Sequence, residues 1–277
     1  MVTPARVTTG RARWPIPMTT RRSVSMLVLL LMAAAAASAQ DYRRLPGGEF
    51  DSALAVDGRA AHMQIAPFDM RIEPVTNAEF LAFVVQHPRW RRGEGPTLLA
   101  GPDFLRHWQG PLQLGDAIQP NQPVTHVSWF AARAYCNSEQ ARLPTWYEWE
   151  YASAADATRA DARRDPLRNQ KMLSAIQTQT GNLPEPVGTR PPNYYGVHDL
   201  NRLLWEWTSD YAAMFPNADA RVPGSVASLA LCGGSALAFA DKNQYALMMR
   251  VAALVALKPV DSAPRVGFRC VRDVSGE

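Results

Sequence analysis

Residues 123–151 read PVTHVSWFAARAYCNSEQARLPTWYEWEY, and this stretch contains a clear helix start. Ser128 is a residue type that caps helices, because its hydroxyl accepts a hydrogen bond from a free backbone N–H. Ala132, Tyr135 and Cys136 follow at helical spacing and share one face. The stretch therefore predicts a helix that starts after Ser128 and buries this face.

Two further helix starts have the spacing of a capping box, in which a hydroxyl and a carboxylate satisfy each other's backbone donors. Thr145 and Glu148 form one pair, and Thr76 and Glu79 form the other. The apolar residues expected on the buried faces are Trp149 and Ala152 in the first helix, and Phe80, Phe83 and Val84 in the second.

His87 and Pro88 end the helix that starts at Thr76, since the residue before a proline avoids helical geometry. Residues 88–123 are then rich in proline, glycine and aromatic residues, without a sustained period. Loops this long are usually functional or packed by their own side chains. Trp90, Phe104 and Trp108 favour the packed version.

Short strands and turns are expected around these helices. Two turn signals in residues 40–60 predict a hairpin-like entry, residues 65–72 predict a strand, and residues 153–171 predict solvated helix or loop. From Pro184 onward the chain predicts short strands separated by turns. Alternation places Trp205 with Trp207 on one side of a strand, and Val266, Phe268 and Cys270 on one side of another.

The charge of the chain is concentrated at its start. The net charge is +4, but residues 1–39 hold five arginines and no acid, which leaves 24 basic and 25 acidic residues in the remainder. No basic stripe with interleaved aromatic residues follows, so we do not expect the protein to bind nucleic acid.

The first 39 residues have the organisation of an export signal peptide. Arg21 and Arg22 form the positive region, residues 26–37 form an apolar run, and residues 37–39 are a small-residue cleavage site. About 20 apolar residues are needed to span a bilayer, so the run favours cleavage over an uncleaved anchor. We expect a periplasmic or secreted protein without stable membrane insertion after cleavage.

Five segments in colinear order resemble the formylglycine-generating enzyme, or sulfatase-modifying factor, family. They are residues 69–80 (DMRIEPVTNAEF), 123–151, 195–210 (YGVHDLNRLLWEWTSD), 233–235 (GGS) and 266–271 (VGFRCV). The resemblance implies one α+β domain over residues 40–277, with the C-type-lectin-like fold of that family, few regular elements and many packed loops.

The same resemblance implies a disulfide between Cys136 and Cys270. Both cysteines lie on predicted apolar faces, and the alternative is a pair of buried free thiols. The third cysteine, Cys232, is a candidate catalytic nucleophile, or a copper ligand with Met248 or Met249. The alternative for Cys232 is a small buried residue.

The oxidase members of the family bind Cu(I) through two cysteines, five residues apart, after the GGS turn. Here residues 235–250 read SALAFADKNQYALMMR and contain no cysteine, so we expect the copper site and its formylglycine chemistry to be absent. The family's calcium site is doubtful as well, because Arg202 and Leu203 replace its usual Gly-Asn, and Glu206 remains as a weak candidate ligand.

Five further residues are candidates for lining a binding groove. They are His107, Trp108, Ser235, Arg250 and Arg269. The alternatives are structural roles: tryptophans that pack the core, and Arg142 and Arg269 paired with Glu148, Glu150 or Glu206. His107 and His126 line a pocket in one interpretation and are histidines satisfied by the backbone in the other.

A narrower resemblance links the chain to a cysteine-poor branch of the family that is associated with copper nitrite reductases. It rests on HPRWRR (87–92), HWQG (107–110), VSWFAARAYC (127–136) and QYALMMRVAALVALK (244–258). This branch is exported and is regarded as an accessory or maturation factor.

Three functions follow as hypotheses. The first is an accessory protein outside the cytoplasm that binds a peptide of a client, such as a copper nitrite reductase, in the former active-site groove. The second is a metal- or cysteine-dependent oxidase or protein-modifying enzyme. The third is a lectin-like ligand-binding module, which rests on fold analogy.

Overall fold

All three predicted helix starts are present in the computed structural model, which describes residues 42–54, 62–178, 183–213 and 244–274. These residues belong to one compact unit. The helices and 3-10 turns are α2 (Asn77–Gln86), η1 (Pro88–Trp90), α3 (Trp129–Ser138), α4 (Trp146–Ala154), α5 (Pro166–Thr178), η2 (Tyr211–Ala213) and α7 (Tyr245–Val255).

The predicted caps are confirmed atom by atom. The Thr76 and Thr145 side chains each accept from the backbone N–H three residues on, and Glu79 and Glu148 each accept from the backbone N–H of the capping residue. The Ser128 hydroxyl accepts from the backbone N–H of Ala131. A cap of this kind contributes about 1 kcal/mol, so local sequence fixes where the helices begin.

The strands are short and pair across long stretches of chain. They are β1 (Tyr42–Leu45), β2 (Gly48–Asp51), β3 (His62–Ile65), β4 (Phe68–Arg71), β5 (Trp205–Glu206), β6 (Val266–Gly267) and β7 (Val271–Asp273). One antiparallel sheet has the order β1-β4-β7, β2 pairs antiparallel with β3, and β5 pairs parallel with β6.

One strand prediction is met in part and one is wrong. The hairpin-like entry corresponds to β2 paired antiparallel with β3, whereas β1 pairs with the later strand β4, and the Asp57-Gly58 turn signal lies outside the described residues. Residues 65–72 are not one strand, because Ala66 and Pro67 separate β3 from β4. Gly47, at φ 68°, makes the turn between β1 and β2 possible, since a Cβ there would lie 2.2 Å from the Ile65 carbonyl oxygen.

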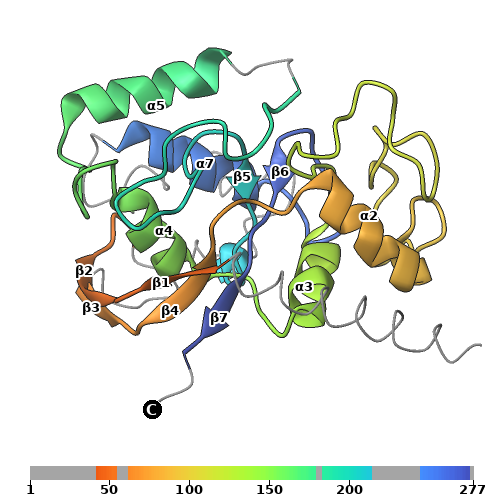
Figure 1. Cartoon of the computed structure of the whole chain (residues 1–277), viewed down its shortest axis with the longest axis horizontal. Helices are drawn as coiled ribbons and strands as arrows, with labels where there is room; N and C mark the ends of the chain where they lie inside the picture. The colour runs from red at the N-terminus through yellow and green to blue at the C-terminus, as the bar shows by residue number, and fades with distance from the viewer. Residues whose placement is uncertain (1–41, 55–61, 179–182, 214–243, 275–277) are drawn as a thin grey trace, which may run out of the picture. The chain divides into compact units, whose positions relative to one another are not determined.

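The prediction of short strands after Pro184 also fails at α7. The residues that α7 buries recur at helical spacing, and they are Ala246, Leu247, Arg250, Val251 and Leu254. Within residues 153–171, the solvated segment becomes helical at Pro166, where α5 begins. Figure 1 shows α5 running alongside α7, and the two helices are in contact.

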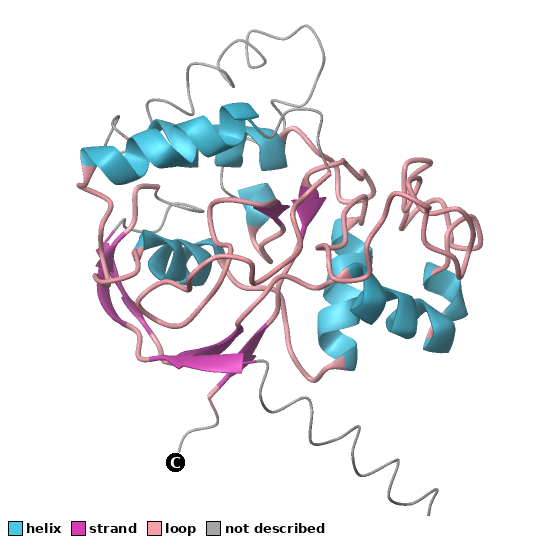
Figure 2. Cartoon of the chain, turned by 45° about the horizontal axis from the view of Figure 1, so that its top comes forward, coloured by secondary structure: helices cyan, strands magenta, loops and turns pink. Residues whose placement is uncertain are grey.

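An aromatic cluster around Phe80 forms one part of the core. The Phe80 ring contacts the rings of Tyr135, Phe268 and Trp108, at centroid distances of 5.9, 6.1 and 6.3 Å. The long loop after α2 is packed by its own side chains, as predicted, because Trp90, Phe104 and Trp108 are all buried. Figure 2 shows how much of the chain runs as such loops.

The disulfide implied by the family resemblance is present. Cys136 on α3 bonds Cys270, just before β7, with an S–S distance of 2.03 Å. Both residues are fully buried, as are Val266 and Phe268, which were expected to face the same way. The bridge joins parts of the chain that are 134 residues apart. Among the described residues, no helix is both long and apolar enough to cross a membrane.

Candidate functional site

A buried ion pair between Glu206 and Arg269 organises the centre of the domain. The Arg269 guanidinium donates to both carboxylate oxygens of Glu206, at 2.8 and 2.9 Å. The Trp149 indole donates to the same carboxylate at 2.9 Å. Burial would raise the pKa of Glu206, but the charge and hydrogen bonds of Arg269 hold it below its ordinary value. Glu206 is therefore ionised and fully paired.

Arg269 thus takes its alternative role, as the partner of an interior acid, and is not a groove residue. It is fully buried and also donates to the backbone oxygens of Arg71, Ile72 and His198. Five donors in a planar fork suit such a crowded acceptor set, which Lys could not satisfy.

Arg250 is likewise buried and does not line an open groove. It donates to the backbone oxygens of Leu204 and Glu206, at 3.3 and 2.7 Å, and its guanidinium lies 3.4 Å from the centroid of the Trp149 ring. Burial lowers the pKa of Arg250, and the Glu206 carboxylate opposes that shift. Arg250 therefore anchors α7 on β5.

Cys232 and Ser235 lie in residues 214–243, outside the described residues. The elements on either side of this segment are η2 and α7, which contact each other. At η2, Tyr211 packs on Trp207 and Trp129, with ring centroids 4.8 and 6.3 Å apart.

The oxygens around Glu206 do not fit a calcium ion. A hard cation requires several oxygen ligands, yet both Glu206 carboxylate oxygens accept from Arg269 and the flanking Leu204 and Glu206 carbonyls accept from Arg250. Two guanidinium groups already supply the positive charge. The suggestion of Glu206 as a calcium ligand is therefore wrong. Within the described part of the chain, no group of three or more His, Cys, Asp or Glu side chains is placed to hold a metal.

The cysteines do not fit the copper site of the oxidase members. The chain has three cysteines, and the Cys136–Cys270 disulfide uses two of them. A site built from two thiolates cannot be formed by the one cysteine that remains, Cys232. We therefore derive no step through copper.

His107 and His126 are next to each other, and the backbone satisfies them only in part, through a hydrogen bond between the His126 ring and the Asp103 backbone. The His107 and His126 rings have centroids 4.9 Å apart, and both nitrogens of His107 and Nδ1 of His126 are buried without a hydrogen bond in the described structure. Burial, then the neighbouring His126, lowers the pKa of His107 to about 3. Burial also lowers the pKa of His126. Trp108 is a core residue whose indole donates to the Asn77 side chain at 3.2 Å.

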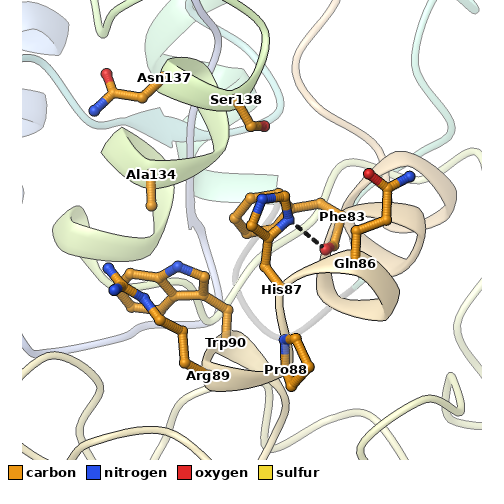
Figure 3. A pocket seen from close by; sticks show the side chains of 9 residues that line it. All are labelled: Phe83, Gln86, His87, Pro88, Arg89, Trp90, Ala134, Asn137 and Ser138. Carbon is orange, nitrogen blue, oxygen red and sulfur yellow. Dashed lines mark hydrogen bonds between the residues drawn. The ribbon is translucent and has the colours of Figure 1, made fainter.

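The structure also contains a pocket that the sequence did not single out as a site. It has a volume of about 550 Å³ and lies between the end of α2, η1 and α3. Figure 3 shows Arg89 and Trp90 at the η1 end, with Asn137 and Ser138 on α3 across from them. The available signal was the HPRWRR stretch, which contributes His87 to Trp90 to the lining.

These features define a mixed α+β domain with many packed loops. One disulfide and a buried arginine–glutamate pair stabilise it. The chain belongs to the sulfatase-modifying factor family, because the model of the sulfatase-modifying factor enzyme 1-like domain matches residues 30–274. The predicted fold class is confirmed by this match.

Several characterised proteins are similar to this chain. The formylglycine-generating enzyme of Streptomyces coelicolor is 34% identical over 280 residues, which cover 83% of this chain and 88% of that protein. The inactive C-alpha-formylglycine-generating enzyme 2 of Bos taurus is 30% identical, with coverages of 82% and 86%. Hercynine oxygenase of Mycolicibacterium smegmatis is 33% identical over 198 residues, which cover 62% of this chain and 46% of that protein. Among solved structures, PvdO from Pseudomonas aeruginosa superposes with a TM-score of 0.49 at 18% identity, over 86% of this chain and 97% of that one.

Proposed function

We propose that this protein is an exported accessory factor that binds a peptide segment of a client protein and does not form formylglycine. The observation that carries the proposal is the cysteine inventory. Two of three cysteines are joined in the Cys136–Cys270 disulfide, so one thiol is left where a paired-thiolate copper site requires two. A family member without the copper site still has the scaffold and its surfaces. Of the two steps of the formylglycine reaction, peptide binding and oxidation, peptide binding is the one that needs only the scaffold and its surfaces.

The similarity to the bovine protein named as inactive supports this proposal, since a relative of the same length range carries that description. The leader supports export, because residues 1–39 combine a positive region, an apolar run and a small-residue cleavage site. The proposed client is a periplasmic metalloenzyme, and the narrower resemblance makes a copper nitrite reductase the first choice.

The test measures client maturation in the native host. Deletion of the gene is expected to lower the copper content and activity of the periplasmic nitrite reductase, and a copy with the Cys232→Ser substitution is expected to restore both. Equal copper content and activity in the deletion strain and its parent would overturn the accessory role for this client.

One observation favours a second function, an oxidation that uses different ligands. Cys232 is the single cysteine that the disulfide leaves over, and two of the relatives are named hercynine oxygenase. If Cys232 is a nucleophile or metal ligand in such a reaction, the Cys232→Ser protein does not restore maturation of the client. The Cys232→Ala and Cys232→Ser proteins themselves fold normally. The same complementation experiment therefore separates the two functions.

A further inference from the structure

One hollow is lined partly by η1 and a second is lined by the chain that directly follows η1, and together we call them the η1 surface. The first is the pocket of about 550 Å³ that Phe83, Trp90 and residues of α3 line. The second has a volume of about 410 Å³ and is lined by residues from Arg91 to Phe104. Both volumes lie in the range typical of ligand sites.

The first hollow combines aromatic rings that are almost fully buried, Phe83 and Trp90, with an exposed arginine that has no acidic partner among the described residues. The Trp90 indole is part of its lining, and the Arg89 guanidinium lies 5.1 Å from the centre of that ring (Figure 3). His87 stacks on Phe83 at 4.5 Å, and its Nδ1 bonds the Phe83 carbonyl oxygen at 3.0 Å. That bond fixes Nδ1 as the protonated nitrogen of the neutral ring and leaves Nε2 as an acceptor.

The second hollow also contains a cation without an acidic partner. Arg91 is occupied, because it donates to the Val84 and Val85 carbonyl oxygens and lies 3.5 Å from Glu94. Arg92, by contrast, makes one hydrogen bond within the described part of the chain, to the Gln109 backbone oxygen at 3.1 Å. Its charge is therefore available to a ligand.

The charge of the η1 surface is of one sign. Of the described residues that line the two hollows, none is an aspartate or a glutamate. Among the described residues, neither Arg89 nor Arg92 has an acidic partner, whereas nearby Arg106 is paired with Asp103 at 3.0 Å. A ligand that fits this surface brings its own carboxylates.

We propose that the η1 surface binds an acidic peptide segment, with an aromatic or aliphatic side chain in the first hollow and carboxylates paired with Arg89 and Arg92. Arginine suits this task because its planar fork pairs with carboxylates and stacks on an indole. The assignment of this peptide to a client protein rests on the proposed function. The binding of acidic peptides to the η1 surface does not depend on that function.

The probe is a library of fluorescein-labelled, end-blocked nine-residue peptides. Each has one central Trp, Phe or Leu flanked by two to four Asp or Glu residues, and each has a matched peptide with Asn and Gln in their place. Fluorescence anisotropy with the full mature protein measures affinity. We expect acidic peptides to bind, and to weaken as salt is raised, because exposed charges are screened.

Variants locate the binding. Arg89→Ala and Arg92→Ala are each expected to weaken the acidic peptides about five- to tenfold, as expected for the loss of one charged hydrogen-bonding partner. Arg89→Lys is expected to recover part of that loss, because it keeps the charge without the planar stack. Arg164→Ala is the matched control, since Arg164 is exposed and lies outside both hollows.

The outcomes are distinct. The proposal is overturned if no acidic peptide binds, if the amide peptides bind equally well, or if Arg164→Ala weakens binding as much as Arg89→Ala. Failure of the proposed function is a separate result: peptides then bind at the η1 surface while gene deletion leaves client maturation unchanged. Conversely, an Arg89→Ala, Arg92→Ala protein that supports full maturation would refute the assignment of the bound peptide to the client and leave the accessory role standing.

Discussion

Arg269 and Glu206 form a two-fold hydrogen-bonded ion pair in which neither side chain is more than 1% exposed. The pair joins β5 to the segment that carries Cys270. The indole of Trp149, on α4, donates a further hydrogen bond to the Glu206 carboxylate. It therefore connects three segments that are far apart in the sequence.

Breaking this pair is expected to destabilise the protein strongly. Glu206→Gln leaves the Arg269 charge buried without its counterion, which costs about 3–5 kcal/mol in the free energy of unfolding. Urea denaturation measures the loss. Asp103→Asn is the control, because it breaks the exposed pair with Arg106, for which a change of about 0–1 kcal/mol is expected. Equal effects of the two substitutions would contradict the central role of Glu206.

The disulfide is expected to stabilise the fold and to leave one free thiol. Replacing Cys136 and Cys270 together by serine should lower the free energy of unfolding by about 2–5 kcal/mol. Cys232→Ser, as the control, leaves the bridge in place. Mass spectrometry of unreduced, alkylated mature protein should find one modified cysteine, Cys232; three modified cysteines would show that the bridge is absent.

The histidine pair predicts a loss of stability in acid. Burial lowers the pKa of His107 to about 3, below the value of 6.5 for an exposed imidazole. The stabilisation by the neutral ring is thus fully present above pH 6.5 and is lost as the pH falls towards 3, at up to about 1.4 kcal/mol per pH unit for one proton. Urea midpoints measured between pH 7 and 4 follow this loss.

His107→Gln removes the titrating ring, so its midpoint should depend less on pH across this interval. His62→Gln is the control, because His62 is exposed beside Asp51 and its pKa is raised by that hydrogen bond. Identical pH slopes for wild type and His107→Gln would mean that His107 is not held neutral in the folded protein.

Removal of divalent metal is expected to leave thermal stability unchanged. The oxygens around Glu206 already accept from Arg250 and Arg269, so a chelator has no calcium to withdraw from this position. Melting curves with EDTA and with added calcium chloride test this expectation. A rise of several degrees with calcium would indicate a site elsewhere and would favour the lectin-like hypothesis.

The sequence was most informative where structure is local. The hydroxyls of Thr76, Ser128 and Thr145 determine helix starts through bonds within three residues, so the pattern alone places them correctly. Strand pairing is different, because β1 pairs with β4 and β4 pairs with β7 across long stretches of chain, and no short-range signal in the sequence specifies these partners.

The arginines show the same limit at the site. A charged residue in a motif is equally compatible with a groove or an interior pair, and only the fold shows that Arg250 and Arg269 meet β5 in the interior. The η1 surface was also beyond sequence reasoning, because Trp90 and α3 come together through the packing of α2 against its long loop. The Cys136–Cys270 bridge came from family resemblance, not from periodicity.

The most direct test of the account combines Cu(I) binding with the chemistry it supports. The mature protein is titrated with Cu(I) against a competing chelator. It is then incubated with oxygen and a sulfatase-type cysteine peptide, and the mass of the peptide is measured by mass spectrometry. With one thiol outside the disulfide, we predict no stoichiometric high-affinity Cu(I) site and no conversion of the peptide cysteine. One tightly held Cu(I) per chain together with oxygen-dependent formation of formylglycine would contradict the account.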